Sequence, residues 1–218
     1  MSFSDAQLDS LLPSYLTQTD KGRIGKGLSQ FFNSNSSDIR YENFYLHSPP
    51  DYFLQADLIE SLPFIEWNTD KQEYVTGFSP VMIISNSCDL QLNHEHLVAK
   101  QGLFAPVAPM EEYLDDLRNN GLEEVKISSI SNNLKNQLYS NIFYLPPCPP
   151  DGIEFIVFLD RIMWHPVKEF NRKLSEIDTE RYVSLDNFGY YLFITKLSYH
   201  FCRVPEELER TNTRRSVI

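Results

Sequence analysis

The sequence has few cysteines and no long apolar run. Its 218 residues contain three cysteines, at positions 88, 148 and 202, and no CxxC pair. A sparse, odd set of cysteines without a signal peptide is typical of free thiols in a reducing compartment. The longest apolar stretch, near Tyr190–Ile194, is far too short to cross a bilayer. We therefore expect a soluble, cytoplasmic protein that does not bind membranes.

Basic residues are also scarce. Nineteen Lys and Arg stand against 30 Asp and Glu, which gives a net charge of −11. A broad acidic surface repels phosphate backbones, so nucleic-acid binding would need a local basic patch. The basic residues gather only in two small clusters, within Lys21–Lys26 and Arg210–Arg215. The charge therefore favours a protein partner and disfavours RNA. It does not predict the oligomeric state.

What the chain does have is apolar and aromatic material. Hydrophobic residues make up 42% and aromatic residues 13%, enough to bury a sizeable core. Helical spacing before a polar loop at Asn33–Asp38 predicts a helical N-terminal extension over residues 1–40. We expect a β-rich core with inserted helices over residues 41–205. A charged, mobile tail would follow over residues 206–218.

Local patterns predict the order of strands and helices within this core. A continuous apolar run at Pro80–Ser85 predicts a strand buried on both faces. The amphipathic stretch Met110–Asn119 predicts a helix, and the mostly apolar stretch Phe188–Cys202 predicts a helix buried in the core. The other predicted strands are Tyr52–Leu58, Gly102–Pro109, 141–147 and 153–160, and a further helix is predicted at Ile130–Leu138.

Several of these segments, taken in order, resemble parts of the MazF/PemK-type toxins, small SH3-like β-barrels that cut RNA. The segments are "GFSPVMIISN", "LFAPVAP" and "FLDRI", preceded by the strand predicted at Tyr52–Leu58. The matching positions are Asp57, Gly77, Pro80, Ser85, Asn86, Ala105, Pro106 and, in the last segment, Asp160 and Arg161. The resemblance implies an α+β fold with an SH3-like (MazF/PemK-like) β-barrel core and helices at both ends.

The chain departs from that family at two positions that carry its chemistry. Ser79 stands where the family places an arginine, and Ala108 stands where it carries a threonine or serine. RNA cleavage needs charge stabilisation at the phosphate and proton transfer to the reacting oxygens. The expected function is therefore a non-catalytic regulatory or interaction protein of the bacterial cytoplasm. Such proteins can be encoded with toxin–antitoxin or phage-defence genes.

The stretch "SNSCDLQLNHEH" (Ser85–His96) also resembles uncharacterised bacterial proteins with a Ser-x-x-Cys-Asp sequence, a resemblance that supplies no activity. Three interpretations of it stay open. Cys88, His94 and His96 could bind zinc in a metal or small-ligand sensor. Cys88 could instead be a nucleophile, with a histidine as its base. The favoured interpretation is structural, with Cys88 as a small buried residue and Asp89 capping a turn.

Carboxylates at predicted strand ends offer one more arrangement. Asp57, Asp89 and Asp160 could converge on one rim and bind Mg²⁺ or act as acid and base. Ordinary turn capping is the favoured alternative. If the chain is an enzyme, we expect an RNA- or nucleotide-acting hydrolase that uses these three aspartates with Cys88 and Arg161. The sequence requires no cofactor, and zinc and magnesium stay as alternatives.

Overall fold

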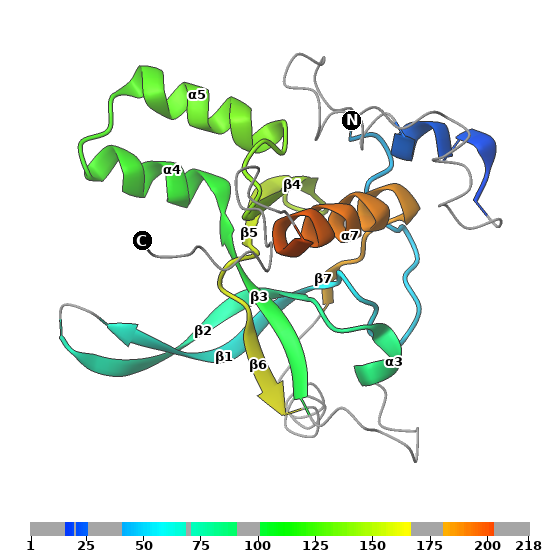
Figure 1. Cartoon of the computed structure of the whole chain (residues 1–218), viewed down its shortest axis with the longest axis horizontal. Helices are drawn as coiled ribbons and strands as arrows, with labels where there is room; N and C mark the ends of the chain where they lie inside the picture. The colour runs from blue at the N-terminus through cyan, green and yellow to red at the C-terminus, as the bar shows by residue number, and fades with distance from the viewer. Residues whose placement is uncertain are drawn as a thin grey trace, which may run out of the picture.

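The computed structural model of the chain describes residues 16–19, 21–25, 41–68, 71–90, 101–166 and 181–202. An antiparallel sheet lies at its centre, with helices packed on it (Figure 1). The strands are β1 Leu58–Asn68, β2 Glu73–Ile83, β3 Gln101–Pro109, β4 Ile142–Cys148, β5 Ile153–Phe158, β6 Met163–Pro166 and β7 Arg181–Val183. The helices are α3 Ser87–Leu90, α4 Met110–Asn119, α5 Glu124–Lys135 and α7 Asn187–Cys202.

The strands of the sheet run in the order β4-β5-β3-β2-β1-β7, and β6 also pairs with β3. β3 is the strand on which the others are organised. Its first residues pair with β6, its middle residues with β2, and its last residues, Val107–Pro109, with β5. Each partner holds only part of β3, so the sheet divides along this strand.

The sheet is not closed, because β4 and β7 stand at its two ends without hydrogen-bonding to each other. Prolines 146, 147, 149 and 150 surround Cys148 at the end of β4, and proline has no N–H to offer a neighbouring strand. The α+β class is confirmed. The SH3-like barrel is not confirmed and stays a prediction.

Several predicted elements are confirmed with close bounds. α4 spans Met110–Asn119 as expected, and β3 and β5 begin within a residue of their predicted starts. The end of β2, Val81–Ile83, is buried on both faces. Met82 belongs to the main core, while Val81 and Ile83 belong to a second core on the other face of the sheet. The further helix begins at Glu124, six residues before its predicted start.

The expected strand at Tyr52–Leu58 is wrong, because β1 begins only at Leu58. The Asp57 carboxylate accepts a hydrogen bond from the backbone N–H of Leu54, and Ala56 has a positive φ of 71°. A side chain that binds its own nearby backbone favours a turn over an extended strand. The turn therefore delays the strand until after Asp57.

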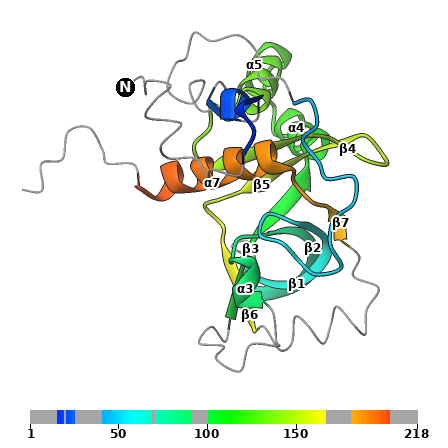
Figure 2. The same cartoon turned by 90° about the vertical axis from the view of Figure 1, so that its right-hand side faces the viewer.

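The main core lies between the sheet and α7, which crosses over it (Figures 1 and 2). The described part of the predicted N-terminal extension contributes Leu16 and Ile24 to this same core. A third cluster of buried side chains joins α4 and α5 to β4 and β5. No helix within the described residues has the length and apolar character needed to cross a membrane.

The prediction that α7 is part of the core is confirmed for its first half. Phe188, Leu192 and Phe193 are buried, whereas Cys202 at the end of the helix is exposed. Gly189 is needed in the first turn, since a Cβ there would lie 2.8 Å from the carbonyl oxygen of Phe44.

A buried lysine is the unexpected member of α7. Lys196 is 1% exposed, and its ammonium group donates a hydrogen bond to the carbonyl oxygen of Gln137. The side-chain amide of Gln137 in turn bonds both the N–H and the C=O of Tyr144 in β4. Burial lowers the pKa of Lys196 from 10.5 to about 7, because it disfavours the charged form.

We expect Lys196 to make stability depend on pH. Above about pH 7 the folded state binds fewer protons than the unfolded chain, whose lysine keeps a pKa near 10.5, so stability rises with pH. The rise is at most ~1.4 kcal/mol per pH unit for one group. Urea unfolding of the wild-type protein and of Lys196→Met, measured from pH 7 to about pH 8.5, should show that the stability of the wild-type protein relative to the variant rises with pH. Unfolded cysteine titrates within this range, but both proteins have the same three cysteines, so that effect cancels in the comparison. Equal slopes would contradict this account.

Candidate functional site

The carboxylate of Asp57 lies inside the protein, in an ion pair. Its Oδ2 atom is 2.7 Å from Nε of Arg181, in β7, and the Asp57 residue is fully buried. Burial raises the pKa of Asp57, while the Leu54 N–H and Arg181 act in the opposite direction. The guanidinium also donates to the carbonyl oxygens of Pro50 and Tyr52. The pair therefore fastens the loop before β1 to β7.

The prediction that Cys88 is a buried thiol is wrong. Cys88 is exposed on the short helix α3, and it is Leu90 of this helix that packs into the second core. The buried run ends at Ile84, so the chain has left the sheet before it reaches the cysteine. The Asp89 carboxylate lies 3.8 Å from the Cys88 thiol. The other two zinc candidates, His94 and His96, lie outside the described residues.

The three aspartates predicted to converge do not form a metal site. Asp57 points to Arg181, Asp89 lies on α3, and Asp160 accepts a hydrogen bond from the Asn141 side chain at 2.9 Å. In the part of the chain that the structure describes, no three His, Cys, Asp or Glu side chains are grouped to hold a metal ion. The expected convergence of all three is therefore wrong, because Arg181 holds the Asp57 carboxylate inside the protein and Asn141 holds that of Asp160.

A groove opens where β3 leaves β2. The two strands pair only between Val81–Ile83 and Phe104–Pro106, after which β3 turns to β5. The cavity volume is about 410 Å³. Its lining residues are Phe64, Ile65, Ser79, Pro106, Val107, Ala108, Phe158, Arg161, Ile162 and Met163. Among these, Arg161 has the only ionisable side chain.

Three residues that the sequence singled out meet in this groove. Ser79 and Ala108 are the two departures from the MazF/PemK pattern, and Arg161 was a catalytic candidate. The Ser79 hydroxyl faces the Val107 carbonyl oxygen at 3.5 Å, and the Arg161 guanidinium lies 4.6 Å above the Phe158 ring centre. The groove thus offers apolar surface, one hydroxyl and one cation. That combination suits binding better than proton transfer.

The hairpin of β1 and β2 extends the groove's apolar surface. It projects away from β3 (Figure 1), and Ile65, Tyr74 and Phe78 on it are 71%, 73% and 67% exposed. Phe78 pairs with Pro63 and Ile65 with Thr76, so Ile65 and Phe78 share one face. Ile65 also lines the groove, so the two surfaces are continuous. The sequence signal was the mostly apolar stretch Leu62–Ile65, which lay beyond the predicted strand.

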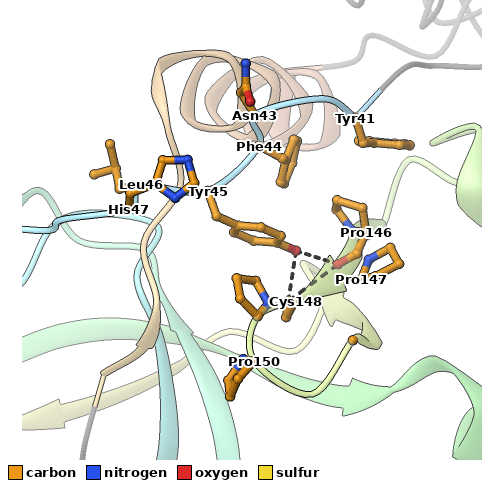
Figure 3. A pocket seen from close by; sticks show the side chains of 12 residues that line it. Tyr41, Asn43, Phe44, Tyr45, Leu46, His47, Pro146, Pro147, Cys148 and Pro150 are labelled. Atoms are coloured by element: carbon orange, nitrogen blue, oxygen red, sulfur yellow. Dashed lines mark hydrogen bonds between the residues drawn. The ribbon is translucent and has the colours of Figure 1, made fainter.

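A second cavity, of about 450 Å³, lies between residues 41–47 and the turn from β4 to β5 (Figure 3). The Tyr45 hydroxyl donates to the Pro146 carbonyl oxygen at 2.6 Å, and the Cys148 thiol lies 2.8 Å from the same hydroxyl. Burial raises the pKa of Cys148 to about 12. The buried, unreactive thiol is thus Cys148 and not Cys88.

No protein-family model matches the chain, and no curated protein and no solved structure is significantly similar to it. The MazF/PemK resemblance therefore stays a prediction, and the site has to be interpreted from its own geometry.

We expect the three thiols to react at different rates. Cys88 and Cys202 are exposed, whereas Cys148 is buried and its pKa is raised. Since the thiolate is the reactive form, a short pulse of iodoacetamide on the native protein should label Cys88 and Cys202 and spare Cys148. Mass spectrometry of the peptides gives the order, and labelling after denaturation is the control. Rapid native labelling of Cys148 would show that the second cavity is open to its base.

Proposed function

We propose that this chain is a non-catalytic interaction protein that holds a protein partner in the groove beside β3 and on the adjoining face of the β1–β2 hairpin. The observation that carries the proposal is the continuity of the two surfaces through Ile65. Large exposed apolar patches on a folded protein usually mark sites of association. Because Ile65 and Phe78 carry the apolar surface out of the groove and along the hairpin, an extended partner fits it better than a small ligand that only fills the groove.

The lining of the groove suggests what the partner carries. Apolar side chains of the partner would fill the space between Phe64, Val107 and Met163. Arg161 stacks on Phe158, which holds its guanidinium in a defined place. A guanidinium binds a carboxylate with two parallel hydrogen bonds. We therefore expect a partner segment with large apolar side chains and one Asp, Glu or terminal carboxylate.

The proposal places this activity in a reducing cytoplasm, which the three free cysteines support. On this proposal the protein regulates its partner by binding it and does not catalyse a reaction. The support for this is local: Ser79 and Ala108 occupy the groove at the positions where the resembling family carries an arginine and a hydroxyl.

Selection from a random-peptide display library against the purified protein tests the site. The enriched peptides should combine large apolar residues with an acidic one, and Arg161→Gln should remove the acidic preference. Ile65→Ser and Phe78→Ser should each weaken binding by about tenfold or more, the effect of losing a central apolar contact.

Val125→Ser is the matched control, because Val125 is also apolar and 82% exposed but lies on α5. It should leave the affinity unchanged. Peptides that bind equally well to the Ile65 and Phe78 variants, or a library that yields no enriched sequence, would refute the proposed docking surface.

We also expect the purified protein not to cleave single-stranded RNA in EDTA. Losing one preorganised charge-stabilising donor costs about 10²–10³ in rate, and both positions that the resembling family uses are changed. Ser79→Arg alone should not restore cleavage, since Ala108 still lacks a hydroxyl. Site-specific cuts by the wild-type protein that disappear in Arg161→Gln would show that the groove is catalytic.

A further inference from the structure

The second cavity lies at the place where the sheet fails to close. On one side, Tyr45 forms a bridge with Leu185, just after β7, and Leu46 donates its N–H to the carbonyl oxygen of Ser184. On the other side, β4 ends at Cys148. Between these two ends, the backbone contacts of a closed sheet are replaced by the side-chain bonds of Tyr45 and Cys148 (Figure 3).

The turn after β4, which forms one wall of this cavity, accepts hydrogen bonds but donates few. The prolines at positions 146, 147, 149 and 150 have carbonyl groups and no N–H. The N–H of Leu46 is bonded to Ser184, and that of Gly152 to the Cys148 carbonyl oxygen at 2.7 Å. The Tyr45 hydroxyl already donates to Pro146. On the opposite wall Asn43 and His47 have side-chain N–H groups, and no lysine or arginine is among the described lining residues. A ligand that brings its own donors therefore suits the proline wall.

The charge near the cavity and the rings that line it also favour a ligand with hydrogen-bond donors, and in particular a planar cation. Asp151, between the lining residues Pro150 and Gly152, carries an exposed carboxylate that accepts a bond from the Tyr182 hydroxyl at 3.1 Å. The whole chain carries −11. The half-buried rings of Tyr41 and Tyr45 and the proline rings line the cavity. A guanidinium is planar, carries five donors and stacks on aromatic rings.

We propose that this cavity binds the guanidinium of an arginine side chain presented by a peptide or protein. The planar group would lie against the Tyr45 ring, donate to proline carbonyl groups and have Asp151 as its counter-charge. This site is separate from the groove beside β3. Arg161 is the one cation among the described residues that line that groove, so the groove favours a partner segment of the opposite charge.

Two blocked tripeptides test the proposal on the full chain: acetyl-Gly-Arg-Gly-amide and the same peptide with citrulline, which has nearly the same shape and no charge. Calorimetry should show saturable binding of the arginine peptide, at least about tenfold tighter than that of the citrulline peptide. Chemical shifts in the protein spectrum should change at Tyr41, Tyr45 and the turn after Cys148.

Variants separate this site from general attraction to an acidic protein. Asp151→Asn should weaken binding of the arginine peptide by about threefold, as expected for an exposed charge pair. Asp116→Asn on α4 removes the same charge elsewhere and should have no effect. Tyr45→Leu should weaken binding further, and if it does not fold, the Asp151 pair of variants still decides the matter. Absent or unsaturable binding, equal binding of the two peptides, an equal loss in Asp116→Asn, or shift changes elsewhere would each overturn the proposal.

Discussion

The buried ion pair between Asp57 and Arg181 is the constraint on which the rest of the structure depends. The backbone of Asp57 accepts the N–H of Ile83, and Ala56 donates to the carbonyl oxygen of the same residue. The ion pair therefore fixes the point at which β1 begins and the residue of β2 that it meets. A buried charge is tolerated only with its partner, so the pair forms as a unit when β7 arrives. The first and the last strand of the described sheet along the chain, β1 and β7, are thereby joined.

The groove follows from this register and from the divided pairing of β3. Once Leu58 is set opposite Met82, Ser79 falls at the point where β2 has lost β3 as a neighbour. Val107 and Ala108 have by then turned to β5. A hollow between two diverging strands is lined by whatever side chains those strands carry there. In this chain they are apolar, with Arg161 supplied by the turn after β5.

Sequence patterns predicted the helices and strands that are determined by the residues within them. The amphipathic spacing of Met110–Asn119 and the apolar run ending β2 needed no knowledge of the fold. The exposure of Cys88 and the burial of Lys196 depend on which neighbours arrive from elsewhere in the chain, so composition and spacing gave no signal for them. The site was found in part. The resemblance directed attention to positions that meet in the groove, but the apolar surface that makes the groove a binding site lay in a strand whose start was misplaced.

The side chain of Gln137 affects whether the folded protein can aggregate at high concentration. An outer strand with free backbone groups is a template on which another chain can add a strand, and repeated addition leads to fibres. Gln137 occupies the N–H and C=O of Tyr144 with its own amide, and prolines follow from residue 146. The Gln137 side chain and the prolines, which have no N–H, therefore prevent another strand from pairing with this edge of β4. Aggregation of the folded protein would have to start at another surface.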